Sequence, residues 1–502
     1  MAWWVWTLWG AGFGVPLVLA AVLWVRSLRA RRADDGPENH RRADNGLTPL
    51  ADVRSKWYRR VPANPWTWVV VAMLVFFAFG LWVQYVLQYS GLVVQVSNDL
   101  KQAGLPDQIL ARDAYNEGLL HVTPYAAATL GAYLLLFLLL DRFRPSTPSM
   151  KLLSLGWGAC AATLFAVFVN SWVGDLLSGG ASGKDIAGNA AAVFVAPFVE
   201  EACKATILFV LVMAMRRRVG SVVQMIGLSG LSAAGFAFVE NIIYYVKLFC
   251  EASLVPGVDA QSYLIQMVQM RGIYTSFGHP LFTMMTAFGL ICGLRQRSKL
   301  ARVICSLTGY MIAALLHMCF NGLATFMSDY RMLTMMGIMV IVGVAGWLVG
   351  QYMAQKRVIA WRLDDYVRMG WLQPRDAAVY PAMLSRLKLS VAGYLRGWRI
   401  GKATTRLMSD VTELAYLRQG VVSGIVDAGA VGREHELVVD ARALRGVALD
   451  DPQGLRLIPR YRGPAAWHTF KAWRAKRASG PPVAQQWAPP VAAQPWGVPA
   501  RV

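Results

Sequence analysis

Two adjacent glutamates and a lysine interrupt an apolar stretch of the chain, in the order Glu200, Glu201 and Lys204. A charge at the centre of a bilayer costs roughly 2.5–3.5 kcal/mol on insertion scales, so charges within an apolar segment indicate a function. On a helix, Lys204 lies about 40° from Glu200 and about 60° from Glu201, so it can neutralise one carboxylate. The two glutamates diverge by about 100°. One of them can therefore contact water or a metal while the lysine or a neighbouring helix holds the other.

Three later apolar segments also carry polar or ionisable residues. The first contains Glu240 and Asn241, the second His279, and the third His317 and Asn321. A glutamate can act as a general base, an imidazole can bind a metal or an oxyanion, and a carboxamide can donate to developing negative charge. Together with the glutamate pair, these residues predict one water-activating site inside the membrane.

The ionisable groups are also expected to share one depth. In a topology with nine spans and an outside N-terminus, Glu201 and His317 lie roughly 15 Å below the outer surface, at about 1.5 Å per helical residue. Glu240 and His279 lie roughly 10 Å below it by the same count. Polar residues with separate structural roles would have no reason to gather at one level. We therefore expect the site in the outer half of the bilayer.

The composition is that of a helical membrane protein. Hydrophobic residues make up 56% of the 502 residues, and the mean hydropathy is +0.40. Soluble domains use roughly 45–50% apolar residues. Apolar runs of about 18 residues or more recur, each long enough to cross about 30 Å of hydrocarbon. We predict an all-α polytopic membrane protein with about nine transmembrane helices, near residues 3–25, 66–88, 123–140, 153–177, 189–215, 221–248, 272–294, 301–327 and 332–353.

The net charge of +21 is distributed in a way that indicates membrane topology. Basic clusters recur in every second connecting segment, which is the positive-inside pattern. They lie at Arg26 to Arg32, Arg54 to Arg60, Arg142 and Arg144, Arg216 to Arg218, Arg295 to Lys299, and from Lys356 onward. The pattern predicts an outside N-terminus and a cytoplasmic C-terminus. Most of the excess charge then faces a lipid bilayer with an anionic inner leaflet, and no nucleic acid is expected as a partner.

We expect five segments along the chain. They are an N-terminal transmembrane anchor (1–25), a basic cytoplasmic linker (26–62), a polytopic membrane domain (63–353, with its catalytic core at about 189–327), a basic amphipathic cytoplasmic region (354–478) and a Pro/Ala-rich disordered tail (479–502). The amphipathic patterns between 360 and 420, with Trp361, Trp371 and Trp398 among arginines, fit a module on the inner membrane face. They fit a small soluble helical domain equally well.

Four motifs, in order on consecutive apolar segments, resemble those of the PrsW family of intramembrane proteases. They are EExxK (Glu200, Glu201, Lys204), GFAxxEN (Gly235, Phe236, Ala237, Glu240, Asn241), an HPxxT-like element (His279, Thr283) and HxxxN (His317, Asn321). PrsW proteins are related to the type II CAAX prenyl proteases and to bacterial abortive-infection proteins. The resemblance covers residues of about 190–325.

The resemblance implies a multi-pass protein of the bacterial cell membrane that cleaves a membrane-anchored protein, such as an anti-sigma factor, near the extracytoplasmic surface. Glu200 and Glu201 become the water-activating pair, and Asn321 becomes an oxyanion donor. His279 and His317 become candidate ligands of a divalent metal such as zinc, together with Glu201 or Glu240. Lys204 joins the catalytic set as counter-ion, and Asn241 as an amide that can equally well bridge helices. Metal-dependent and glutamate-driven mechanisms both remain open.

Three other functions fit part of this pattern. An ion- or proton-coupled transporter would use the same Glu, Lys and His residues as a relay, although no internal repeat pairs the two halves of the chain. A non-catalytic membrane scaffold would explain a Glu–Lys pair, but not two histidines and a further glutamate at the same level. A CAAX-type prenyl-peptide endopeptidase would share the chemistry and differ in substrate.

Overall fold

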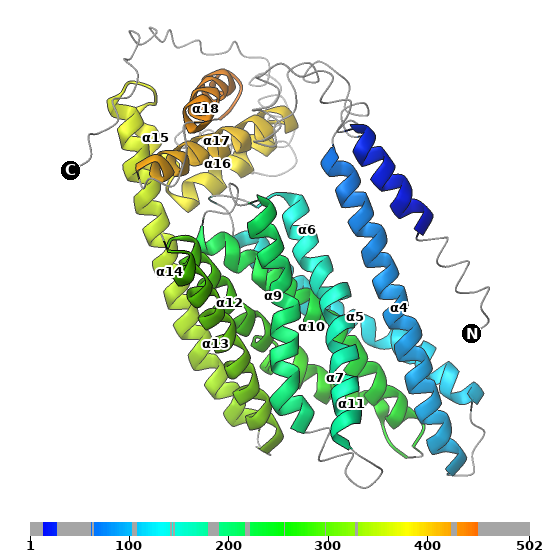
Figure 1. Cartoon of the computed structure of the whole chain (residues 1–502). Helices are drawn as coiled ribbons and strands as arrows, with labels where there is room; N and C mark the ends of the chain where they lie inside the picture. Colours follow the sequence, from blue (N-terminus) through cyan, green and yellow to red (C-terminus); the bar gives the residue numbers. More distant parts are fainter. Residues whose placement is uncertain are drawn as a thin grey trace, which may run out of the picture. The chain divides into compact units, whose positions relative to one another are not determined.

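The computed structural model describes residues 14–27, 62, 65–102, 108–140, 143, 146–178, 190–215, 221–255, 257–296, 298–326, 330–422 and 429–449. Every regular element in these ranges is a helix (Figure 1). The chain divides into two compact units. One comprises Met1–Arg142 and Ser146–Gly346, and the other Phe143–Pro145 and Trp347–Val502.

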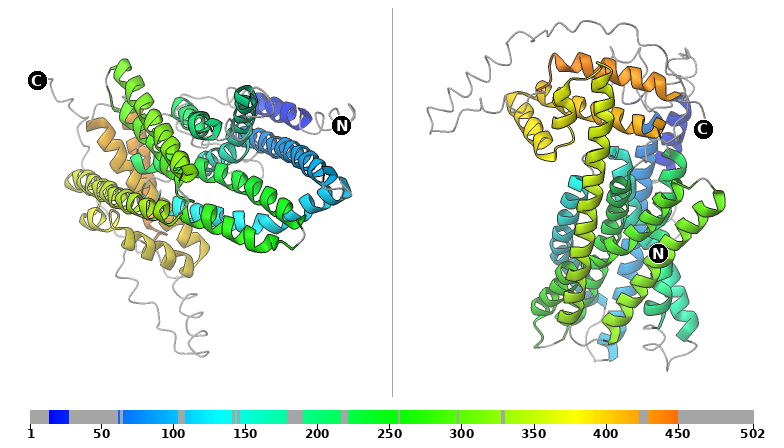
Figure 2. Two further views of the ribbon diagram at one scale, coloured as in Figure 1. Left: turned by 90° about the horizontal axis from the view of Figure 1, so that it is seen from below. Right: turned by 90° about the vertical axis from the view of Figure 1, so that its left-hand side faces the viewer.

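The first unit is a bundle of long helices, several of which change winding along their length. Three π-helical stretches, η2, η3 and η4, continue directly into or from α-helices. The elements are α4 (Pro65–Gln102), α5 (Gln108–Leu140), α6 (Pro148–Gly156), η2 (Trp157–Ala162), α7 (Thr163–Ser178), η3 (Ala191–Val195), α9 (Ala196–Met215), α10 (Val222–Ser253), α11 (Ala260–Met267), η4 (Val268–Tyr274), α12 (Gly278–Leu294), α13 (Lys299–Phe326) and, up to Gly346, the first part of α14 (Tyr330–Arg368). Helices α9, α10, α12 and α13 run side by side along much of their length (Figures 1 and 2).

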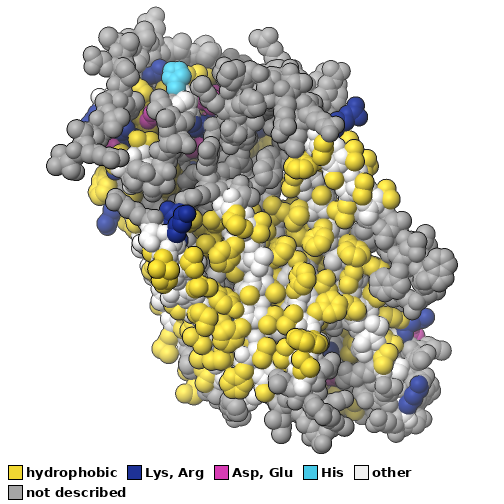
Figure 3. Space-filling view, in the orientation of Figure 1, with side chains coloured by type: hydrophobic (Ala, Val, Ile, Leu, Met, Phe, Trp, Pro, Cys, Tyr) yellow, Lys and Arg dark blue, Asp and Glu magenta, His cyan; other side chains and the backbone are white. Residues whose placement is uncertain are grey.

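Seven helices among the described residues are long and apolar enough to cross a membrane. They are Thr67–Val94, Arg112–Leu138, Pro148–Gly174, Val222–Ser253, Ala260–Leu294, Lys299–Thr325 and Gly337–Arg368. Apolar side chains also dominate the visible outer face of this unit (Figure 3). The predicted all-helical membrane architecture is therefore confirmed.

The number of nine spans and the orientation of the termini stay predictions. Of the first predicted span, the structure describes a shorter apolar helix, Gly14–Ser27. The fifth predicted span corresponds to η3 and α9. It contains the three charged residues of the EExxK motif and is not among the seven apolar helices. Nearly all of the predicted linker 26–62 and the whole tail 479–502 lie outside the described residues.

Helix α10 lies at the centre of this bundle. In an 18-residue apolar stretch of this helix, 94% of the residues are buried inside the protein. Helix α10 packs closely against the continuous helix formed by α6 and η2, because each side of the contact has a glycine where it meets the backbone of the other. A Cβ at Gly158 would lie 1.8 Å from the Ser232 carbonyl oxygen, and one at Gly235 would lie 2.2 Å from that of Leu155. Small residues commonly allow helices in lipid to approach this closely.

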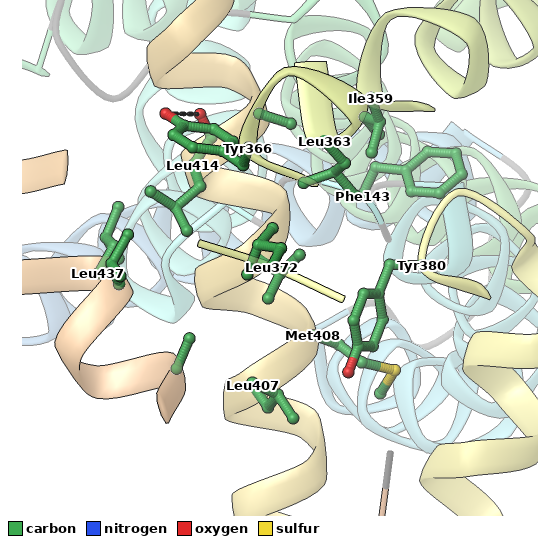
Figure 4. Close-up of a cluster of buried hydrophobic side chains, with 14 of the residues drawn as sticks. Phe143, Ile359, Leu363, Tyr366, Leu372, Tyr380, Leu407, Met408, Leu414 and Leu437 are labelled. Carbon is green, nitrogen blue, oxygen red and sulfur yellow. Dashed lines mark hydrogen bonds between the residues drawn. The ribbon is translucent and has the colours of Figure 1, made fainter. Parts of the chain in front are cut away.

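The second unit has a hydrophobic core of its own (Figure 4). The C-terminal part of α14 contributes Ile359, Leu363 and Tyr366 to it. The other elements are α15 (Pro374–Val379), α16 (Met383–Arg396), α17 (Trp398–Val422) and α18 (Gly429–Arg445). Leu414 of α17 and Leu437 of α18 belong to the same core. The Tyr366 hydroxyl group donates to the Glu434 carboxylate on α18 and lies 3.4 Å from the Leu414 carbonyl oxygen. The amphipathic pattern of this region thus forms a helical module.

Candidate active site

Helix α9 places three charged side chains in the interior of the first unit. Glu201 and Lys204 are fully buried, and Glu200 is 7% exposed. The Lys204 ammonium donates to Glu201 Oε1 at 2.7 Å and lies 3.5 Å from Glu200 Oε2. It also lies 4.3 Å from the centre of the Phe236 ring on α10. A buried charge requires such partners, because its desolvation would otherwise be costly.

Both carboxylate oxygens of Glu201 are engaged by neighbouring helices. Oε1 accepts from Lys204 and lies 3.1 Å from His317 Nδ1, while Oε2 accepts from the Thr283 hydroxyl at 2.7 Å. An ionised carboxylate has no proton to donate, so His317 Nδ1 carries the hydrogen in this contact. Glu201 therefore joins α9, α12 and α13 and fixes the orientation of the His317 ring.

His279 at the start of α12 is held from both sides. Its Nδ1 lies 2.9 Å from Lys204 Nζ, and its Nε2 lies 2.8 Å from Glu240 Oε2. Because an ammonium group can only donate, Nδ1 accepts and Nε2 donates its hydrogen to the carboxylate. Lys204, His279 and Glu240 thus form a continuous hydrogen-bonded chain from α9 through α12 to α10.

An arginine closes this chain on the side of η4. Arg271 Nη2 lies 2.7 Å from Glu240 Oε2, and its Nε donates to Asn241 Oδ1 at 3.3 Å. Its guanidinium group lies over the Tyr244 ring, 3.9 Å from the ring centre. The sequence marks Arg271 only as a charge at the end of an apolar segment. In the structure it orients both polar residues of the GFAxxEN motif.

The ring of His317 leaves one nitrogen facing Glu200. It stacks on Phe282, with ring centres 4.9 Å apart, and meets His279 edge-on at 5.3 Å. Since Nδ1 carries the hydrogen, the lone pair of the ring is on Nε2. This atom lies 3.9 Å from Glu200 Oε2, which is buried and has no hydrogen-bond partner.

Two asparagines border the same carboxylate and cavity. Asn321, the predicted oxyanion donor, donates to the Ala192 carbonyl oxygen in η3 at 2.9 Å. Asn170 on α7 donates to Glu200 Oε1 at 3.4 Å, while its own Oδ1 is buried without a partner. The motifs give no indication of Asn170. Its only sequence signal is a carboxamide within an otherwise apolar run.

These residues line one cavity of about 510 Å³. Polar groups from six helical segments face it, among them Asn170, Glu200, Glu240, Arg271, His279, His317 and Asn321. Glu201 and Lys204 lie behind this wall. The structure therefore brings all eight predicted site residues into one region, and it separates those that face the cavity from those that support them.

A metal ion can be considered at Glu200, His279 and His317, each of which offers one ligand atom within 4.8 Å of the others. Glu200 and His317 fit this role, because a carboxylate oxygen without a hydrogen bond faces an imidazole nitrogen that carries no hydrogen. Glu201 would then orient His317 through its contact with Nδ1, as a carboxylate commonly does for a metal-binding histidine. Both nitrogens of His279 are already hydrogen-bonded, so it could join as a ligand only after one of these bonds is replaced. The sequence suggested Glu201 or Glu240 as the carboxylate ligand of the metal. In the structure, the carboxylate that lies with the two histidines is that of Glu200.

Fold and site together define a polytopic helical membrane protein with a carboxylate–lysine–histidine centre in a cavity between its helices. Residues 146–348 match the PrsW family, described as intramembrane metalloproteases. The predicted resemblance is thus confirmed, and the match extends beyond the predicted core of 189–327 on both sides. It supports an intramembrane protease. Neither a comparison with curated proteins nor one with solved structures found a match.

Proposed function

We propose that this protein is an intramembrane protease that hydrolyses a peptide bond of a membrane-anchored protein, with Glu200 and His317 at the reacting centre. The observation that carries the proposal is Oε2 of Glu200, which accepts no hydrogen bond and faces His317 Nε2 across 3.9 Å in the wall of the cavity, with Lys204 Nζ 3.5 Å away. A buried polar atom without a partner is costly, and such atoms are retained where water, an ion or a substrate occupies the space.

In this mechanism Glu200 takes a proton from the attacking water and later delivers it to the leaving amine. His317 Nε2 orients the same water, while Glu201 keeps the imidazole ring in place. Lys204 offsets the charge of the two glutamates. The second amide hydrogen of Asn170 or Asn321 is available for the oxyanion that forms on the scissile carbonyl. Asn241 acts through Arg271 and Glu240 to position His279.

A divalent metal such as zinc is compatible with this arrangement. Glu200 and His317 would hold it, with His279 as a third candidate, and the ion would polarise the carbonyl group and make bound water easier to deprotonate. In that version Glu200 and His317 would serve as ligands, while Glu201, Lys204, Asn170 and Asn321 would keep the roles given above.

The proposed substrate is a single-pass protein such as an anti-sigma factor, cut near the extracytoplasmic surface of a bacterial cell membrane. The family match and the membrane-spanning helices support a membrane-embedded substrate. The side of the membrane rests on the positive-inside pattern of the sequence.

The test reconstitutes the full-length protein in vesicles with a single-pass membrane protein and compares wild type with Glu200→Gln. The variant should lose cleavage by 10²-fold or more, as expected for an acid–base group. Adding a chelator distinguishes the metal-dependent mechanism from the glutamate-driven one. Only a metal-dependent enzyme should lose activity with the chelator and regain it when zinc is added back. Normal cleavage by Glu200→Gln would exclude the proposed centre. Cleavage of a prenylated peptide alone would favour the CAAX-type activity.

A further inference from the structure

Helix α16 has an exposed apolar face that no described element of the second unit covers. Leu384, Leu387, Val391 and Leu395 form one stripe along it, with Tyr394 beside them. Their spacing of three or four residues places them on the same side of the helix. The exposed fraction is 71% for Leu384 at one end and 45% for Leu395 at the other, so the stripe is open along the length of the helix.

The opposite face of α16 is buried in the second unit. Leu389, Ala392 and Gly393 pack there, and the buried Arg386 donates to the Thr412 hydroxyl group on α17 at 2.6 Å. The helix therefore has an inner face for the core of the unit and an outer face of the same apolar character. Aromatic residues extend the outer face, because Trp398 at the start of α17 is 74% exposed.

The chain segment that contains this face carries charges of one sign. Between Asp376 and Asp410 the sequence has six basic residues and no acidic one: Arg386, Lys388, Arg396, Arg399, Lys402 and Arg406. Lys388 and Arg399 are exposed beside the stripe. A helix with an apolar face, basic flanks and tryptophan or tyrosine at its edge has the composition of helices that lie in the surface of an anionic bilayer.

The position of α16 in the chain favours the same partner. Helix α14 contains the last of the seven apolar helices, Gly337–Arg368, and α16 begins soon after it at Met383. Trp361, near the end of that apolar helix, is 66% exposed, and tryptophan is enriched where spans leave the membrane. A short connection thus keeps α16 close to the membrane surface.

We propose that α16 lies in the membrane surface, with its apolar stripe among the lipid acyl chains and Lys388 and Arg399 at anionic headgroups. The second unit would then be a membrane-bound module, not a freely soluble one. This inference is independent of the proteolytic activity, because it rests on residues outside the cavity.

The test places a photoreactive diazirine amino acid at Val391 of the full-length protein, in vesicles with and without phosphatidylglycerol. His435, an exposed polar position on α18, is the matched control. Illumination should attach lipid at position 391 and several-fold less at 435. A cross-link from 391 to another segment of the chain or to a second copy would overturn the proposal, as would equal labelling at both positions.

Two double variants separate the apolar and the electrostatic contributions. Leu387→Glu with Leu395→Glu should reduce the lipid adduct at 391 several-fold in both kinds of vesicle. Lys388→Gln with Arg399→Gln should abolish only the increase that phosphatidylglycerol produces. All four side chains point away from the core, so the unit should stay folded, as circular dichroism can verify. An unchanged lipid adduct in the first variant would contradict insertion of the stripe.

Discussion

At the scale of single residues, the two adjacent glutamates have different surroundings. Glu201 is fully buried, and Lys204, His317 and Thr283 occupy its oxygens. Glu200 borders the cavity and keeps one oxygen without a hydrogen bond. Neighbouring positions on a helix point about 100° apart. Glu201 therefore faces the protein interior, while Glu200 faces the cavity.

This difference predicts that Glu200→Gln and Glu201→Gln fail in different ways. Both should lose proteolysis, but Glu201→Gln should lower the unfolding temperature in detergent more than Glu200→Gln does, because the contacts of Glu201 are shorter and more numerous. Removing one partner of a buried ion pair typically costs about 3–5 kcal/mol, and Glu201 also supports Thr283 and His317. Thermal unfolding and cleavage measured on the same preparations decide this. Equal unfolding temperatures for both variants would contradict a supporting role for Glu201.

Asn170 gives a second prediction at this scale. Its amide lies 3.4 Å from Glu200 Oε1, so Asn170→Ala should lower kcat by about 10²-fold if the amide contacts the oxyanion. The KM should change little, because the contact forms mainly in the transition state. Ser171→Ala, at the next position in the cavity wall, is the matched control. Equal kinetics for the two variants would remove Asn170 from the site.

The sequence indicated which ionisable residues come together in the interior, but not which of them contact one another. A glutamate, lysine or histidine in an apolar segment is conspicuous because burial makes it costly, and this identified residues such as Lys204 and His317. The role of Glu201 depends on Thr283, which comes from another helix at a distance that no local pattern encodes. Asn170 was missed because a single carboxamide in an apolar run has no distinctive spacing.

At the scale of elements, π-helical stretches adjoin the cavity. Ala192 in η3 provides the carbonyl oxygen that accepts from Asn321, and Arg271 lies in η4, whereas no residue of η2 lines the cavity. Such stretches are often found at functional sites because they re-aim side chains within a helix. The sequence predicted the helices themselves correctly. It could not indicate the change of winding, since the apolar composition is the same on both sides of it.

The contact between η2 and α10 predicts that Gly158→Ala is destabilising. A methyl group there would lie 1.8 Å from the Ser232 carbonyl oxygen, so the backbone of α10 would have to move. Overpacking of this kind typically costs about 1–3 kcal/mol. Gly131→Ala on α5 is the control, because nothing lies within 4 Å of its added Cβ. If both variants unfold at the same temperature in detergent, the close helix contact is not as described.

Asp410 on α17 predicts a pH dependence in the second unit. Burial raises the pKa of this carboxyl group from 3.8 to about 7, although Arg406 opposes the shift. Between these two values the folded state binds more protons than the unfolded state. The stability of the unit should therefore fall as the pH rises from about 4 to 7, by at most roughly 1.4 kcal/mol per pH unit.

Asp410→Asn removes this titration. At pH 8 the backbone amides of α17 should exchange more slowly in this variant than in wild type, and at pH 5 the difference between the two proteins should be smaller. Hydrogen exchange of α17 peptides in the full-length protein, corrected for intrinsic rates, measures it. A difference that is the same at both pH values would show that the titration of Asp410 is not coupled to folding.

At the scale of the whole molecule, the orientation of α9 decides where the site lies in the membrane. This helix carries three charged residues and is not one of the seven apolar helices, yet the positive-inside pattern requires it to cross. Its connections to α7 and α10, around Gly183 and Arg218, lie outside the described residues. The crossing of α9 is therefore a separate prediction from the packing of its side chains.

Reporter fusions at these two connections test that prediction directly. A fusion after Arg218 should report the cytoplasm, because Arg216 to Arg218 form one of the basic clusters, and so should a fusion after Arg297. A fusion near Gly183 should report the outside, which places Glu200 and Glu201 between the two surfaces. A cytoplasmic signal at Gly183 would show that α9 does not cross. The charged residues would then lie in a re-entrant segment open to the cytoplasm, and cleavage near the extracytoplasmic surface would have to be abandoned.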